Sequence, residues 1–280
     1  MESQGLADRD ARRRRRLTVL LAIPFGLAIG LAVGLLGGGG SVLAVPILVY
    51  VLDQPVSDAT TASLVVVAAG AMAGGLRHAR SGRVCWRHAG SFTAAALPGI
   101  VAGTLLGNHV SGELLLGGFA LIMLAAAHAT WRKAEEDDDE EGEWEKGNFC
   151  PPLRLPRDIL AGAAVGLLTG FFGIGGGFLI VPTLAIALAF TVRTAVGTSL
   201  AIITATSLLG LVTHLAAGRS LDAGLTLTMA IACVIGAIAG AQLTGRLSQR
   251  ILGRGFALLV TAVAAYLLIS AVFLGGPPSS

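Results

Sequence analysis

The chain has 280 residues, of which 54% are hydrophobic and only 13% are charged, and its mean hydropathy is +0.77. A soluble domain carries about 25% charged residues, so this composition argues against a soluble globular protein and favours many membrane-spanning helices. The net charge of +3 comes from basic flanks of apolar segments and does not indicate a nucleic-acid partner.

The chain opens with a basic tail, residues 1–16, which ends in the five arginines Arg12–Arg16. The apolar run that follows, residues 17–36, is longer than the hydrophobic region of a secretory signal and is not closed by an A-x-A-like site. We therefore expect a first membrane helix here rather than a signal peptide.

Residues 34–46, GLLGGGGSVLAVP, interrupt the apolar sequence with glycines and close on a proline. Each glycine weakens a helix by about 1 kcal/mol relative to alanine, and proline lacks a backbone N–H. Irregular backbone inside a bilayer is tolerated only where protein or water satisfies its polar groups. We expect a helix end within the membrane, followed by a short segment, 41–52, that either spans marginally or enters and returns.

Three further helices are expected in the first half, at residues 57–77, 89–109 and 113–131. An acidic segment then separates the two halves: nine of the 17 acidic residues fall within Glu135–Glu145. Such a run of like charges is typical of a solvated segment, so residues 132–156 are predicted to be a cytoplasmic linker.

The second half repeats the pattern of the first, since residues 170–182 are GFFGIGGGFLIVP. A displacement of 136 residues superimposes Pro46 on Pro182, and an ordered series of serine, histidine and arginine matches follows in the same register. The second copy is expected to contain 158–172, a short segment 178–190, and helices at 194–216, 222–244 and 255–274.

The predicted fold is therefore an all-α polytopic membrane protein made of two homologous repeats, residues 17–131 and 157–274, with a C-terminal tail, 275–280. Each repeat has about four spanning helices plus one short Gly-rich broken or re-entrant segment. With re-entrant short segments and a cytoplasmic N-terminus, 16 of the 20 basic residues fall on the cytoplasmic side, where Lys and Arg collect. This count predicts that both termini and the linker are cytoplasmic, and that the two repeats have the same orientation.

The paired motifs GLLGGGGSVLAVP and GFFGIGGGFLIVP, in a duplicated apolar chain of this size, resemble the sulfite exporter TauE/SafE family. The resemblance covers the chain outside the N-terminal tail and the linker. It implies a transporter of the bacterial-type inner membrane that moves sulfite or organosulfur anions. Ser41 stands where the second copy has Gly177, so the two motifs need not be equivalent.

A helical segment that starts directly after such glycines has free N–H groups and a positive dipole end, and both favour an anion. We expect the two breaks to face a common cavity at the repeat interface, where transporters bind substrate. Helix packing through small residues is the alternative, and it explains spacings such as Gly26, Gly30 and Gly34. The predicted substrate-binding residues are Gly37, Gly38, Gly39, Gly40, Ser41, Pro46, Gly173, Gly175, Gly176, Gly177, Pro182, Ser63, Thr198 and Ser199.

Ser63, Thr198 and Ser199 lie near the predicted starts of the following helices, where hydroxyls either cap backbone N–H groups or donate to an oxyanion. Asp53 and Asp58 are candidates for proton coupling because carboxylates at a membrane boundary often relay protons. Turn formation around Pro55 is the alternative for both.

His78 and His214 occupy equivalent places in the two repeats, at the predicted cytoplasmic ends of corresponding helices. Because histidine changes charge near neutral pH, they are candidates for gating or proton coupling, and ordinary placement at the membrane interface is the alternative. His88 has no counterpart in the other repeat and is assigned no role.

The sequence contains no H-E-x-x-H, G-x-S-x-G or phosphate-loop motif, and we expect neither an enzyme nor a bound cofactor or metal. The three cysteines, Cys85, Cys150 and Cys233, have no metal-ligand spacing. The leading hypothesis is a secondary transporter of a small anion, in contact with the lipid bilayer and able to form a homodimer. A passive anion channel and a non-transporting membrane scaffold are the alternatives.

Overall fold

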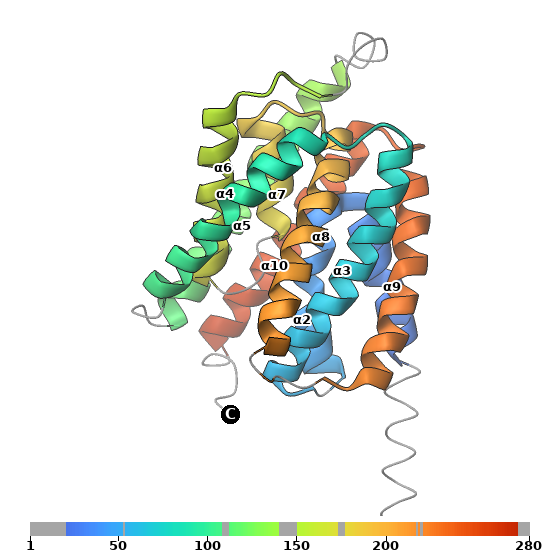
Figure 1. The fold of residues 1–280 in the computed structure, drawn as a ribbon, viewed down its shortest axis with the longest axis vertical. Helices are drawn as coiled ribbons and strands as arrows, with labels where there is room; N and C mark the ends of the chain where they lie inside the picture. The colour runs from blue at the N-terminus through green and yellow to red at the C-terminus, as the bar shows by residue number, and fades with distance from the viewer. Residues whose placement is uncertain are drawn as a thin grey trace, which may run out of the picture.

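The computed structural model describes residues 21–52, 54–107, 112–139, 150–172, 177–216, 218 and 221–273. These residues form helices with short connections, and no strand occurs among them (Figure 1). After a helix at 21–36 the elements are η1 (Gly37–Gly40), α2 (Ser41–Pro46), η2 (Ile47–Val51), α3 (Val56–Arg80), α4 (Trp86–Gly107), α5 (Gly112–Asp139), α6 (Leu155–Phe172), α7 (Gly177–Pro182), η4 (Thr183–Ala187), α8 (Val192–Ala216), α9 (Ala223–Thr244) and α10 (Gln249–Phe273).

Five helical stretches are long and apolar enough to cross a membrane by length and composition. They are Leu21–Val51, Asp58–Arg80, Trp86–Leu106, Val192–Ala216 and Ala223–Thr244. The predicted all-α, multi-pass class is therefore confirmed for the part of the chain that the structure describes.

The helix of residues 21–36 does not continue straight into α2. The backbone of Gly37 has a φ of +67°, a conformation that side chains other than glycine rarely adopt. A Cβ atom built on Gly40 would lie 2.4 Å from the backbone nitrogen of Val33, so the chain after the turn lies against the helix before it. Residues 21–51 therefore form a helical hairpin.

The second Gly-rich motif occupies the corresponding place between α6 and α7. Its turn, residues 173–176, lies outside the described residues. In Figure 1, α6 descends from the upper end of the view, and α7 and η4 lead back up to the start of α8. The two hairpins thus enter from opposite ends of the molecule.

Both prolines precede the same irregularity. Pro46 closes α2 and Pro182 closes α7, and each is followed by five π-helical residues. Because proline cannot donate a backbone hydrogen bond, it disturbs the regular helical pattern around it. The predicted disturbance is present at both prolines.

The direction of the chain differs from the predicted topology. In Figure 1, α5 ends and α6 begins at the upper end, whereas helix 21–36 begins and α10 ends at the lower end. We call these the linker end and the tail end. Helix 21–36 and α6 each turn back, and the helices between them, α3 to α5, lead from the tail end to the linker end, so the second half starts from the opposite end of the molecule. Helix 21–36 and α6 therefore begin at opposite ends of the molecule, which differs from the predicted common orientation of the two repeats.

The outer arm of each hairpin packs on a helix of the other half of the chain. A Cβ on Gly30 would lie 2.0 Å from the carbonyl oxygen of Cys233 in α9, and a Cβ on Gly166 of α6 would lie 2.2 Å from that of Ala96 in α4. Only glycine permits such a close approach of two helix backbones. Packing through Gly26, Gly30 and Gly34 is confirmed.

The remaining helices pair as α3 with α8 and α5 with α10. At the linker end, Arg254 of α10 donates to Glu135 of α5 across 3.0 Å, and its guanidinium lies 5.1 Å from the ring centroid of Trp131. These contacts join α5, the last helix of the first half, to α10, the last helix of the second half, at the linker end.

Candidate functional site

The tips of the two hairpins meet inside the protein. A Cβ built on Gly38 would lie only 1.6 Å from the carbonyl oxygen of Gly177 and 2.2 Å from its carbonyl carbon. The two backbones are therefore in direct contact, although they come from motifs in opposite halves of the sequence. Gly37–Gly40 are all buried.

Two serines lie at this contact. Ser41 donates to the carbonyl oxygen of Gly38 across 2.7 Å, and its hydroxyl would meet a Cβ on Gly177 at 2.5 Å. Ser199 donates to Val196 within α8 across 2.8 Å, and its hydroxyl would lie 2.5 Å from a Cβ on Gly37. The hairpin junction, as we call it, consists of Gly37, Gly38, Ser41, Gly177 and Ser199.

Other predicted binding residues lie around the junction without joining it. A Cβ on Gly39 would meet the ring of Phe256 in α10 at 3.2 Å, and Gly40 faces Val33. Pro46 and Pro182 lie at the far ends of α2 and α7. The predicted residues Gly173, Gly175 and Gly176 lie outside the described part of the chain.

The hydroxyls of Ser63 and Thr198 are not helix caps, because α3 and α8 begin at Val56 and Val192, well before them. Ser63 donates to Thr60 across 2.8 Å within its own helix. Thr198 is fully buried and accepts a hydrogen bond from the backbone N–H of Cys85 at 3.1 Å. The capping alternative is thus wrong for both.

The end of the first hairpin helix is held by two side chains from other helices. The carbonyl oxygen of Gly34 lies 3.3 Å from Nε2 of His78 in α3 and accepts from Thr244 of α9 at the same distance. Both side chains are buried. The last carbonyls of a helix have no partner within it, so these contacts stabilise the helix end that precedes Gly37.

Thr244→Val is expected to lower the free energy of unfolding by about 1 kcal/mol, because it removes a buried donor without a large change in volume. Thr228→Val is the matched control, since Thr228 is half-buried on the same helix and its hydroxyl donates to Gly224 of that helix, just as Thr244 also donates to Gly240. The measurement is the thermal unfolding midpoint of the purified protein. Equal midpoints for the two variants would contradict the role of Thr244.

The two predicted histidines do not share one side. His78 is near the end of α3 at the linker end, whereas His214 is near the end of α8 at the tail end. Nδ1 of His214 lies 3.1 Å from the hydroxyl of Thr61 in α3. Asp58 is half-buried in the first turn of α3, and Asp53 lies outside the described residues.

Fully buried carboxylates are rare among the described residues. Among the described residues, Asp158 is the only fully buried carboxylate, and it lies at the linker end. Arg83, between α3 and α4, is half-buried, and its carbonyl oxygen would lie 2.4 Å from a Cβ on Gly197 of α8. Burial first, and then the charge of Arg193, lower the pKa of Arg83, which still remains protonated at physiological pH.

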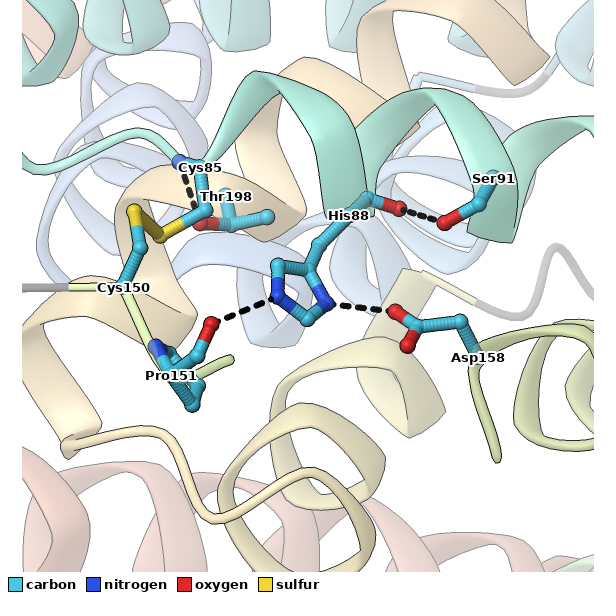
Figure 2. Close-up of polar contacts among 7 residues, drawn as sticks. All are labelled: Cys85, His88, Ser91, Cys150, Pro151, Asp158 and Thr198. Atoms are coloured by element: carbon cyan, nitrogen blue, oxygen red, sulfur yellow. Dashed lines mark hydrogen bonds and ion pairs between the residues drawn. A yellow bond between two sulfur atoms is a disulfide. The ribbon is translucent and has the colours of Figure 1, made fainter. Parts of the chain in front are cut away.

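Sequence reasoning missed a polar cluster at the linker end, which Figure 2 shows. Nδ1 of His88 in α4 lies 2.5 Å from Oδ1 of Asp158 in α6, and both side chains are buried. A disulfide joins Cys85 to Cys150 beside this pair. His88 and Asp158 are far apart in the sequence, as are the two cysteines. They come together because the two halves of the chain pack against each other.

Cutting the chain between residues 140 and 149 is expected to leave the two fragments joined through the disulfide Cys85–Cys150. To measure this, a specific protease site is inserted there and the purified protein is cleaved. The sizes of the products are then compared on non-reducing and reducing gels. The two fragments of Cys150→Ser should separate without reductant. The fragments of Cys233→Ser should stay joined, because Cys233 is not in a disulfide. Fragments of the wild type that separate without reductant would contradict the disulfide.

Comparisons with known proteins point to one family. Residues 22–267 match the family model described as "Sulfite exporter TauE/SafE". A "Probable membrane transporter protein" of Xylella fastidiosa is 36% identical over 90% of this chain and 95% of its own length. A protein with the same description from Methanocaldococcus jannaschii is 28% identical over 87% and 93%, and one from Bacillus subtilis is 26% identical over 89% and 100%. No solved structure matches the chain.

Proposed function

Because the chain belongs to the TauE/SafE sulfite exporter family of membrane transporters, we propose that it is a secondary transporter of a small anion, sulfite or an organosulfonate. The anion would bind at the hairpin junction, between the two homologous halves. The observation that supports this proposal best is the backbone contact between Gly38 and Gly177, which joins two broken helices from opposite halves.

The junction has the chemistry that an anion requires. The helical segment that starts at Gly37 has no side-chain cap at its N-terminus, so its first amides are oriented toward the turn without a side-chain acceptor. Backbone amides and the positive end of the helix dipole favour negative charge there. The hydroxyls of Ser41 and Ser199 add polar groups, and Asp158, the only fully buried carboxylate among the described residues, lies away from them at the linker end.

The arrangement of the hairpins also suits alternating access. One hairpin enters from the tail end and the other from the linker end, and their tips meet (Figure 1). Separating one half from the other on either side of the junction would open it to one end at a time. Transporters built from inverted repeats use this geometry, with discontinuous helices at the central site.

Flux into liposomes tests the proposal. Purified protein is reconstituted, and uptake of sulfite, methanesulfonate, sulfate and a neutral control is compared with that of empty vesicles. Saturable uptake of sulfite or the sulfonate, stimulated by the same anion inside the vesicle, is expected. Non-saturating flux would favour the channel, and equal uptake with and without protein would favour the scaffold.

We place the tail end in the cytoplasm of a bacterial-type inner membrane, so that both termini are cytoplasmic and the linker is outside. The disulfide Cys85–Cys150 supports this orientation, because disulfides persist mainly outside the cytoplasm. The basic residues at the ends of α3, α9 and the starts of α4 and α10 count against it under the positive-inside rule.

A reporter fused to the C-terminus decides between the two orientations. A fluorescent protein that matures only in the cytoplasm should fluoresce at this position, and alkaline phosphatase fused there should be inactive. An epitope inserted between residues 140 and 149 should bind antibody in intact spheroplasts. The reverse pattern in all three would place the linker in the cytoplasm.

A further inference from the structure

We propose that His88 and Asp158 form a proton-binding site through which proton movement is coupled to anion transport. This inference rests on the proposed function and assigns it a coupling ion. Figure 2 shows the pair; Asp158 is in the first turn of α6, which begins at the linker end (Figure 1), at the base of the second hairpin.

The hydrogen-bond pattern of His88 requires an additional proton. A neutral imidazole has one N–H donor and one bare nitrogen. Here both ring nitrogens face oxygen acceptors: Nδ1 lies 2.5 Å from Oδ1 of Asp158, and Nε2 lies 3.1 Å from the carbonyl oxygen of Pro151. Because the carbonyl oxygen of Pro151 can only accept, both contacts are hydrogen bonds at the same time only when Nε2 carries a proton and a second proton lies between Nδ1 and the carboxyl group.

That second proton belongs to the pair, either on the imidazole or on the carboxyl group. When it leaves, the one remaining ring proton can serve only one of the two contacts, and the pair carries a net charge of −1. Asp158 is 0% and His88 3% exposed, so this charge would be buried, and the position of Asp158 in the first turn of α6 offsets only part of the cost of burying it. Oδ2 of Asp158, which has no hydrogen-bond partner among the described residues, adds to that cost.

No other charged group near the pair provides compensation through a contact that the structure describes. On α4 the neighbouring Arg87 is exposed, and on the approach to α6 and its first turn Arg154 and Arg157 are exposed. On α8, Arg193 donates to the carbonyl oxygen of Leu247. From the segment between η4 and α8, the group that meets His88 is the ring of Phe190, edge to face at 5.0 Å.

The position of the pair explains how the proton would act on transport. Asp158 is on the outer arm of the second hairpin, Phe190 is at the end of its returning arm, and His88 is on α4 of the other half. The proton therefore holds both arms of one hairpin against the other half. Loss of the proton would weaken the contacts at the base of the second hairpin. The same hairpin reaches the hairpin junction at Gly177.

The pair has no counterpart at the aligned positions of the first hairpin. The register of 136 residues aligns Asp158 with Ala22, which is fully buried, and His88 with Gly224. Neither aligned residue has a titratable side chain.

The test measures anion flux and proton movement together in proteoliposomes of the full chain. The probes are labelled sulfite and methanesulfonate, the latter because it carries no titratable proton near neutral pH, and a pH-sensitive dye inside the vesicle reports protons. For the wild type, methanesulfonate flux should change the internal pH, and the flux of both anions should depend on external pH. Anion flux without any pH change would overturn this inference and leave the proposed function standing, whereas no anion flux would overturn the proposed function.

Asp158→Asn should abolish the anion-dependent pH change and flatten the pH dependence, while exchange of labelled for unlabelled anion persists. Asp222→Asn is the matched control, because it also removes a carboxylate at the start of a helix, where Asp222 accepts from the N–H groups of Gly224 and Leu225. It should keep the coupled pH change. A coupled pH change that survives in Asp158→Asn would overturn the proposal.

A double variant addresses the case in which Asp158→Asn does not fold. His88→Leu with Asp158→Leu removes both side chains of the pair, an exchange that buried ion pairs often tolerate, and leaves the partly buried carbonyl oxygen of Pro151 without the contact to His88. It should fold and transport without proton movement. Coupled proton movement in this double variant would show that the proton binds elsewhere.

Discussion

Gly38→Ala is expected to abolish anion flux and to lower the free energy of unfolding by about 3 kcal/mol or more. The added methyl group would lie 1.6 Å from the carbonyl oxygen of Gly177, and backbone atoms cannot move aside as a flexible side chain can. The two hairpin tips must therefore separate. The measurements are sulfite flux into proteoliposomes and the thermal unfolding midpoint in detergent.

Gly90→Ala is the control for this substitution. Gly90 lies in helix α4 with nothing within 4 Å of an added Cβ, so alanine should be neutral or slightly stabilising there. Wild-type flux and stability in Gly38→Ala would show that the tips do not touch, and the proposed site would fail with that contact.

Gly30→Ala and Gly166→Ala are expected to destabilise the protein by similar amounts, about 2–3 kcal/mol each. The reason is the same at both places: a new methyl group would lie 2.0 Å from the carbonyl oxygen of Cys233 or 2.2 Å from that of Ala96. Each substitution forces an outer hairpin arm away from the helix of the other half. Thermal unfolding midpoints measure the effect.

Gly75→Ala supplies the comparison, since its Cβ would make an ordinary contact of 3.4 Å with Leu200. A melting temperature of Gly30→Ala or Gly166→Ala equal to that of Gly75→Ala would contradict the close helix packing. A loss in only one of the two would show that the hairpins are not held in equivalent ways.

The breaks in the two hairpins follow from the sequence, because runs of glycine closed by proline cannot form a regular helix. The direction of the chain after each break does not. A segment of about 12 residues, such as 41–52, spans too little of a bilayer to force a crossing and is long enough to make one arm of a hairpin. The chain reverses direction at Gly37, and after the turn Gly40 lies against Val33. The hydropathy pattern and the charge distribution of the sequence do not reveal this contact.

Some of the predicted residues lie together, and their role in binding an anion stays a prediction. Gly37, Gly38, Ser41, Gly177 and Ser199 come together, since glycines and small hydroxyls are the residues that allow two backbones to touch. Ser63 and Thr198 were grouped with them by sequence position, but one bonds within its own helix and the other faces Cys85.

The pair His88–Asp158 could not be predicted, because each residue is unremarkable in its own segment. The small-residue spacing offered a signal that was not used: Gly99 and Gly103 in α4 match the four-residue spacing of Gly162, Gly166 and Gly170 in α6. Matched spacings of this kind in two segments indicate helices that pack closely, and they would have brought α4 and α6 together.

The outer arm of each hairpin packs on a helix of the other half, and this arrangement constrains the order in which the chain can fold during synthesis. Residues 21–51 emerge early from the ribosome, yet the helix that covers their glycine face, α9, is synthesised only near the end. During most of translation the glycine face of this segment therefore lacks the helix that covers it in the finished protein. We expect neither half to fold on its own, because each provides the partner of the other's hairpin.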